Sequence, residues 1–229
     1  MLNDFSIFKD SEALLDTRLS QKGLAVVRLD GAKFSSLTKQ FEKPFSDVFE
    51  NAMNDTATAV FKRVLPGALV VYVASDEISL IVSDSVAALP YGRRVQKITS
   101  LSASFAALAF DRAVPNIKGF PAFDSRVLSL DEDSYVREYI TWRRLDCRKN
   151  ATSMAAESLM SHKALMGVST RDRGEALVGT RFEKISEGTF NGRFIRRAKG
   201  HFTVDPATRE LTEELCAAAV ERHNEASQN

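Results

Sequence analysis

Two short apolar runs that lie only three residues apart are the feature that most constrains this fold. Residues 69–74 and 78–82 are rich in β-branched side chains, which is typical of buried strands. The connection between them, Ser75-Asp76-Glu77, has the length of a hairpin turn. A third apolar run at residues 24–29 ends in Asp30-Gly31 and predicts another strand that is buried on both faces.

Two long stretches with helical spacing lie between these strands and a fourth one. Apolar residues recur at helical spacing over residues 45–63 and again over 93–112, and residues 123–130 have a strand pattern. A shorter helix is expected at residues 11–20. The order β-α-β-β-α-β predicts an α+β fold of the ferredoxin-like type over residues 1–130.

The chain changes character after residue 130. Residues 131 to about 162 predict one long helix, and residues 165–192 are less regular. A small hairpin at 192–204 and a terminal helix at 210–225 follow. We expect residues 131–229 to form a smaller helical part that packs on the first part.

The composition excludes several classes of protein. The 229 residues are 44% hydrophobic and 27% charged, as in ordinary globular proteins, so general disorder is excluded. The 31 basic and 30 acidic residues leave a net charge of +1, so a nucleic-acid partner would have to use local patches. Two cysteines, Cys147 and Cys216, exclude a disulfide scaffold. The sequence shows neither a signal peptide nor a membrane span, and we expect a cytoplasmic protein without a membrane partner.

Three carboxylates are expected to converge at one edge of the sheet. In a βαββαβ sheet the first strand lies beside the third, which brings Asp30 close to Asp76 and Glu77. Three such groups need a compensating charge, and Mg²⁺ prefers carboxylates together with substrate phosphates. The carbonyl of Gly31 could be a further ligand, and two metals shared by two aspartates suit nucleotidyl transfer. The alternative is that Asp-Gly is only a turn and Ser-Asp-Glu only a solvated hairpin tip.

Basic residues gather at two other places. Arg93, Arg94 and Lys97 mark the start of the second long helix, where free backbone N–H groups favour a bound phosphate. Lys43 precedes the first long helix and is a weaker indication of the same kind. In the second part of the chain, two basic clusters contrast with an acidic segment at 205–225, as on a surface that follows a phosphate backbone. These clusters are Arg143, Arg144, Arg148 and Lys149, and then Arg193, Arg196, Arg197 and Lys199. Solvated helix faces would give the same patterns.

A series of short motifs resembles one known family. The chain is similar to the tRNA-histidine guanylyltransferases, a family that includes guanylyltransferase-like 3′–5′ RNA polymerases. The resemblance covers about residues 20–155 and is faint beyond them. The motifs, in family order, are Arg28-Leu29-Asp30-Gly31, Phe34, Phe41-Glu42-Lys43-Pro44, Ser75-Asp76-Glu77, Arg93-Arg94-x-x-Lys97, Phe123-Asp124-x-Arg126 and Tyr139-x-x-Trp142-Arg143-x-x-Asp146-x-x-x-Asn150.

The resemblance implies a palm domain like that of polymerases, two Mg²⁺ ions, a homotetramer that is a dimer of dimers, and nucleotide addition to a tRNA 5′ end. It implies that ATP or GTP activates the 5′-monophosphate and that GTP or a templated nucleoside triphosphate is then added. Asp30 and Asp76 would bind both metals with the Gly31 carbonyl, and Glu77 would support the second carboxylate.

The same resemblance assigns binding roles to a larger set of residues. Nucleotide binding would involve Asp30, Gly31, Ala32, Lys33, Phe34, Ser35, Lys43, Ser75, Asp76, Arg93, Arg94 and Lys97. RNA binding is expected of the second part of the chain, through Arg143, Arg144, Arg148, Asn150 and Arg197. The second part is also expected to form the oligomer.

Three departures from the family pattern narrow the expectation. Ala32 stands where the family usually has Arg after Asp-Gly, and the acid after Lys43-Pro44 falls at Asp47, one position later than in the family. The stretch Arg148-Lys149-Asn150-Ala151 replaces a His-Ile-Asn-Asn sequence that is linked with dedicated histidine-tRNA recognition. This favours the polymerase-like branch, which repairs tRNA 5′ ends.

Two other functions remain open from the sequence. A palm-fold nucleotide cyclase, such as a diguanylate cyclase, would share the carboxylate edge but would not need the basic second part. A non-catalytic RNA-binding module would need that second part but not the three carboxylates.

Overall fold

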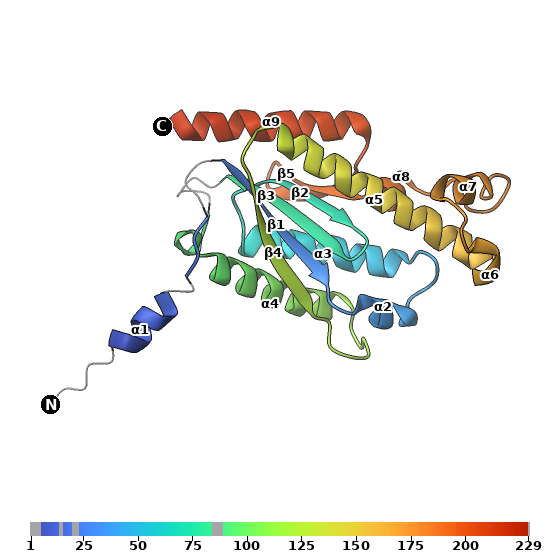
Figure 1. Ribbon diagram of the computed structural model, residues 1–229, viewed down its shortest axis with the longest axis horizontal. Coiled ribbons are helices and arrows are strands. Elements are labelled where there is room, and N and C mark those ends of the chain that lie inside the picture. The colour runs from blue at the N-terminus through green and yellow to red at the C-terminus, as the bar shows by residue number, and fades with distance from the viewer. Residues whose placement is uncertain (1–5, 14–15, 20–22, 84–88, 229) are drawn as a thin grey trace.

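A computed structural model describes residues 6–13, 16–19, 23–83 and 89–228 of the chain. In these residues six strands form one sheet in the order β4-β1-β3-β2-β5-β6, and every neighbouring pair is antiparallel (Figure 1). The strands are β1 (Leu24–Gly31), β2 (Ala68–Ala74), β3 (Glu77–Ser83), β4 (Phe123–Leu130), β5 (Arg193–Ala198) and β6 (His201–Pro206).

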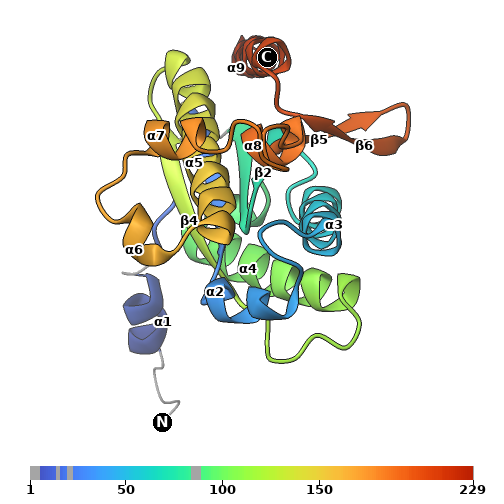
Figure 2. The ribbon, with the colours of Figure 1, turned by 90° about the vertical axis from the view of Figure 1, so that its right-hand side faces the viewer.

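Helices cover both faces of this sheet, and this explains why the central strands are apolar throughout. The helices α3 (Asp47–Arg63) and α4 (Val95–Ala113) pack on the face that carries Val27 and Leu29. The opposite face, which carries Val26, is covered by α5 (Ser134–Leu159) and α9 (Arg209–Gln228). Figure 2 shows α3 and α4 on one side of the strands and α5 on the other.

Short elements connect the main ones. Ser46 begins α3 as its N-cap, because its hydroxyl accepts a 3.3 Å hydrogen bond from the Phe49 amide. The remaining elements are α1 (Ser6–Ala13), α2 (Phe34–Leu37), η1 (Thr38–Gln40), η2 (Tyr91–Arg93), α6 (His162–Leu165), α7 (Thr170–Glu175) and α8 (Glu187–Asn191).

The four expected strands, their pairing and the two long helices of the first part are confirmed. The expected helix at residues 11–20 is wrong in its position. The described helix is Ser6–Ala13, and residues 16–19 are not helical, while residues 14–15 and 20 lie outside the described part. The reason is that this segment bonds with the start of α4: Leu19 N–H donates to Arg93 O (3.0 Å), and Val95 N–H donates to Thr17 O (2.9 Å).

The second part of the chain shares the sheet and the core of the first. Strand β5 pairs with β2 through Tyr72 opposite Phe194, and both side chains are fully buried in the α5 face of the core. The expected hairpin is β5–β6, and the expected long and terminal helices are α5 and α9. A domain boundary near residue 130 stays a prediction. No helix in the described residues is both long enough and apolar enough to cross a membrane.

Candidate active site

The register of the sheet places the predicted carboxylates side by side. Asp30 lies directly opposite Glu77 of β3, and Gly31 N–H donates to Asp76 O at 3.1 Å. A two-residue turn connects β2 and β3, and Ser75 within it has a left-handed backbone (φ 52°). Asp30, Asp76 and Glu77 therefore meet at one edge of the sheet, as the sequence predicts.

Asp76 carries a charge that its protein surroundings leave poorly compensated. Burial is the largest cause that raises the pKa of its carboxyl group, and the neighbouring charge of Asp30 raises it further. Its own backbone N–H and the Ser75 hydroxyl lower the pKa. A cation beside this carboxylate would offset the cost of its charge.

Glu77, by contrast, is held by arginines. Burial raises the pKa of the Glu77 carboxyl, and Arg143 and Arg28 oppose that rise. Arg143 Nε lies 2.7 Å from Glu77 Oε1, and Arg28 Nε lies 3.8 Å from Oε2. The Ser79 hydroxyl also donates to Oε1 at 3.3 Å. Glu77 is thus oriented by the protein, while Asp30 and Asp76 remain available to a metal.

The donor set suits Mg²⁺ that is shared with a phosphate. Within the described residues, no group of three or more His, Cys, Asp or Glu side chains is arranged to hold a metal ion. Mg²⁺ commonly takes only one or two protein carboxylates and completes its shell with water and substrate phosphates. Asp30 and Asp76 supply those two carboxylates, and the Gly31 carbonyl directly follows Asp30 in the chain. A cation would also compensate the buried charge of Asp76.

These carboxylates line a cleft of about 430 Å³, which is within the range of small-molecule sites. We call it the carboxylate cleft. Aromatic rings of Phe41, Phe45 and Phe49 form part of its wall. It brings together many of the residues predicted from the sequence, namely Asp30, Phe34, Ser35, Lys43, Ser75, Asp76, Glu77, Arg143 and Asn150.

Gly31 is required by the close approach of the Phe34 ring. A Cβ at position 31 would clash with that ring, so a larger residue would displace it. The ring is buried and packs edge-on against Phe123, with centroids 5.0 Å apart. The buried Phe34 ring therefore anchors the loop that follows Asp30 to the core. Within this loop Ala32 and Lys33 are exposed, and Lys33 has a left-handed backbone (φ 59°).

The basic group at residues 93–97 lies at the other end of the sheet. Strand β3 runs away from Asp76, so α4 begins near the start of β1, where Arg93 O bonds Leu19 N–H. The two ends of the sheet are about 20 Å apart, because strand β1 runs from one to the other at about 3.3 Å per residue. Arg93 precedes α4, and Arg94 makes a 2.7 Å ion pair with Asp16. Within one chain, Arg93, Arg94 and Lys97 are outside the carboxylate cleft.

The predicted RNA-binding arginines are divided between the cleft and the surface. Arg143 faces the cleft through its pair with Glu77, and Asn150 donates a 3.4 Å hydrogen bond to Asp146. Arg148 is exposed and lies over the Phe190 ring, while Arg144 is half-buried. The exposed side chain of Arg197 contacts the faces of two rings on α3 and β6. RNA binding by these residues stays a prediction.

The back wall of the cleft contains a buried network that sequence analysis missed, and Arg193, which was expected in a basic surface cluster, belongs to it instead. Arg193 donates through Nη1 to Glu50 Oε2 and through Nε to Asn54 Oδ1, each at 2.8 Å. Thr189 Oγ1 donates to Glu50 Oε1 at 2.8 Å. Glu50 and Asn54 are four residues apart on α3, and this spacing on an otherwise apolar face was the available signal.

The fold and the site together define the class. A βαββαβ sheet with two aspartates where β1 ends and β3 begins, and with a cleft beside them, is the arrangement of a palm-type α+β protein. The chain belongs to the tRNA(His) guanylyltransferase family, because the sequence model of that family matches residues 5–131, more than half of the chain. This confirms the resemblance.

Individual relatives agree with this assignment. tRNA(His) guanylyltransferase 1 of Arabidopsis thaliana is 33% identical over an alignment of 147 residues that covers 59% of this chain. A bacterial tRNA(His) guanylyltransferase (Thg1)-like protein in complex with ATP is 28% identical with a TM-score of 0.85, over 95% of this chain and 97% of that one. The corresponding GTP complex is 26% identical with a TM-score of 0.77, over 92% and 97%. The chain spans only 25% of the length of the Arabidopsis relative.

Proposed function

We propose that this chain is a Mg²⁺-dependent nucleotidyltransferase that adds GTP, or templated nucleoside triphosphates, to the 5′ end of tRNA in the 3′–5′ direction. The observation that carries the proposal is the pair Asp30 and Asp76 at the mouth of the carboxylate cleft, in a chain of this family. The bacterial relatives with ATP and GTP support the choice of nucleotides.

The protein's part in the reaction follows from the site. In the proposed step, the 3′-hydroxyl of the incoming nucleotide attacks the activated 5′ phosphate of the RNA, and the activating group leaves. Asp30, Asp76 and the Gly31 carbonyl would hold two Mg²⁺ ions, which lower the pKa of the attacking hydroxyl and neutralise the charge on phosphate. Glu77 keeps the Asp76 turn in place through Arg143.

Other residues of the cleft would hold the nucleotide. The Ser35 and Ser75 hydroxyls and the Lys43 ammonium group line the same cleft and can contact phosphate oxygens. The rings of Phe41, Phe45 and Phe49 offer apolar surface to a nucleobase. ATP or GTP would occupy this cleft during activation of a 5′-monophosphate.

The remaining nucleotide-binding residues would act from a second copy of the chain. Arg93, Arg94 and Lys97 lie at the opposite end of the sheet from Asp30, so their proposed role requires a neighbouring subunit. This supports self-association of the chain, and the homotetramer, a dimer of dimers, that we propose is the form that the family resemblance implies. We also propose a cytoplasmic location, which suits two cysteines that are free and buried.

The experiment that tests the function uses two tRNAs with a 5′-monophosphate, one of full length and one that lacks the first nucleotide. Each is incubated with Mg²⁺ and labelled nucleoside triphosphates, and the label is mapped along the RNA. Addition at the 5′ end supports the proposal, and preference for the shortened tRNA supports templated repair. A cyclic nucleotide formed without RNA would contradict it.

A further inference from the structure

Phe120 is an aromatic side chain that the fold leaves almost fully in water. Its exposed fraction is 96%, higher than that of any other large apolar side chain in the described residues. It lies on the connection between α4 and β4, whose neighbouring residues Ile117 and Phe123 pack in the core. Nothing in the core or in the cleft therefore accounts for Phe120.

The loop that carries Phe120 is held in place beside the carboxylate cleft. Gln40 clamps it, because Gln40 Nε2 donates to Lys118 O (3.0 Å) and Gln40 Oε1 accepts from Lys118 N–H (2.9 Å). On its other side, Ala32 N–H donates to Ala122 O at 2.8 Å. Ala32 directly follows the Asp30-Gly31 pair. The backbone on both sides of Phe120 is thus held, through Ala32, next to the Asp30-Gly31 pair.

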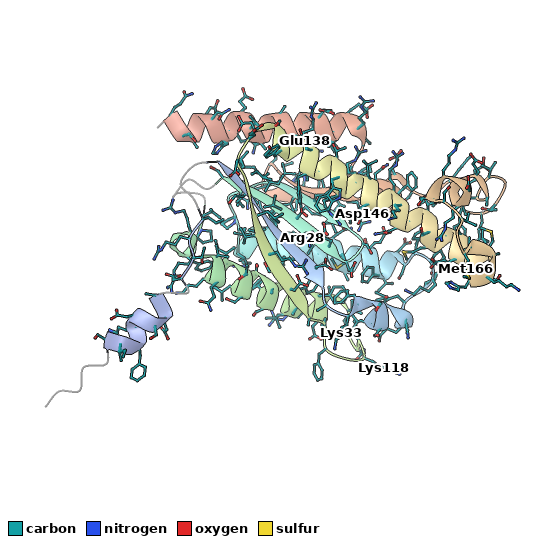
Figure 3. All side chains as sticks on the ribbon, in the orientation of Figure 1. Arg28, Lys33, Lys118, Glu138, Asp146 and Met166 are labelled. Atoms are coloured by element: carbon teal, nitrogen blue, oxygen red, sulfur yellow. The ribbon has the colours of Figure 1, made fainter. Side chains whose placement is uncertain are left out.

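Three exposed lysines surround this loop. Lys33 precedes α2, Lys39 lies in η1 next to Gln40, and Lys118 lies in the loop itself. Figure 3 shows Lys33 and Lys118 at the same end of the molecule. None of the three makes an ion pair with a described residue. The acids of this region, Glu42 and Asp47, line a neighbouring groove of about 520 Å³.

We propose that Phe120 with Lys33, Lys39 and Lys118 is a binding surface for the unpaired nucleotides that lie beside the 5′ end of the substrate RNA. Every nucleobase has a face that can stack on an aromatic ring, and lysines contact phosphates without regard to sequence. An exposed ring on a held loop, beside lysines that make no ion pair with a described residue, has both features. The inference rests on the proposed function, since it places this segment next to the 5′ end in the cleft.

The test measures binding without catalysis. The probes are two labelled hairpin RNAs with a 5′-monophosphate, one with four unpaired nucleotides at its 3′ end and one that is blunt. Phe120→Ala should weaken binding of the tailed RNA at least fivefold and leave the blunt RNA unchanged, because one stacked base is lost. Phe120→Trp should restore the affinity. Met166→Ala, at an exposed side chain that Figure 3 shows apart from Lys118, is the matched control.

The lysines are tested by salt dependence. Lys39→Gln and Lys118→Gln should each weaken binding of the tailed RNA. Each should also reduce the slope of log Kd against log salt concentration by about one. Lys163→Gln, at an exposed lysine of α6, is the control. Sedimentation of the same variants reports on assembly.

The possible results separate this inference from the proposed function. If the Phe120→Ala variant binds each RNA as tightly as the unchanged protein does, the inference is overturned and the proposed function is unaffected. Loss of self-association with unaltered RNA binding would also overturn it, since the surface would then join copies of the chain. If the unchanged protein binds neither RNA, both the inference and the proposed function fail.

Discussion

Arg143 Nε lies 2.7 Å from Glu77 Oε1, and this ion pair connects helix α5 to the turn that carries Asp76. Both side chains are largely buried, with exposed fractions of 12% and 8%. Arg143 also contacts Asp146 Oδ2 at 3.1 Å through Nη2. The second part of the chain therefore takes part directly in the geometry around Asp30, Asp76 and Glu77.

Arg143→Ala should lower both stability and activity. It leaves the Glu77 carboxylate buried without its main partner, and breaking a buried pair typically costs about 3 kcal/mol. Chemical denaturation measures that loss. For nucleotide addition, kcat should fall while the KM for the nucleotide changes little. The reason is that the change displaces the turn that carries Asp76 and not the residues that bind the nucleotide.

Two further variants separate the pair from its surroundings. The double variant Arg143→Ala with Glu77→Gln should lose less free energy of unfolding than the two single variants lose together. The reason is that the double change leaves no unpaired charge at this pair. Lys149→Ala, at an exposed position of the same helix, should leave stability unchanged. Fully additive effects would contradict a direct Arg143–Glu77 interaction.

Asp76→Asn should abolish nucleotide addition and leave the fold intact. The pKa of Asp76 is raised mainly by burial, so the metal-free protein is relieved of an unfavourable charge, and its melting temperature should stay level or rise. Asp30→Ala should likewise end activity, because both aspartates hold the metal in the proposed site. Mg²⁺ should raise the melting temperature of either variant less than that of the unchanged protein. Activity in either variant would be inconsistent with the proposed site.

Lys43→Ala and Lys97→Ala should behave differently when the assembly is dissociated. Lys43 lines the carboxylate cleft, so its loss should weaken nucleotide binding in single chains and in the assembly alike. Lys97 lies at the far end of the sheet, so its loss should matter only in the assembly. Titration with a fluorescent GTP analogue at low and high protein concentration checks this. An effect of Lys97→Ala on isolated chains would show that the two ends communicate within one chain.

The cysteines should resist alkylation until high pH. Burial raises the pKa of the Cys147 thiol to about 11 and that of Cys216 to about 12. The neutral thiol is favoured in the folded chain, so this contribution to stability is complete below the ordinary thiol pKa and is lost as pH rises toward 11. At pH 8 only about one Cys147 in a thousand is a thiolate, and labelling with iodoacetamide should be correspondingly slow. Nucleotide should slow labelling of Cys147, which lines the cleft, but not of Cys216.

The meeting of the three carboxylates was predictable because it depends on local signals and a simple topology. The short connection Ser75-Asp76-Glu77 defines a hairpin, and the strand order then sets Asp30 beside it. The distance of Lys97 from the cleft also follows from topology, since a helix after β3 must begin at the end opposite Asp76. The motif alone does not show this.

The role of Arg143 was not predictable in the same way. The sequence shows a basic cluster on a helix, and only the rotation of α5 against the sheet decides that Arg143 faces Glu77 while Arg148 faces solvent. The loop that carries Phe120 is held by Gln40, whose hydrogen bond to Lys118 joins segments 78 residues apart. Such long-range contacts leave no periodic trace in the sequence.

The central claim is tested most directly by the fate of the γ-phosphate. When the 3′-hydroxyl of an incoming GTP attacks the RNA 5′ end, its own triphosphate stays on the product. A tRNA with a 5′-triphosphate and an oxidised 3′ end, incubated with γ-labelled GTP and Mg²⁺, should therefore become labelled at its 5′ end, and Asp76→Asn should prevent this. Label released only as pyrophosphate, or equal labelling by the variant, would contradict the account.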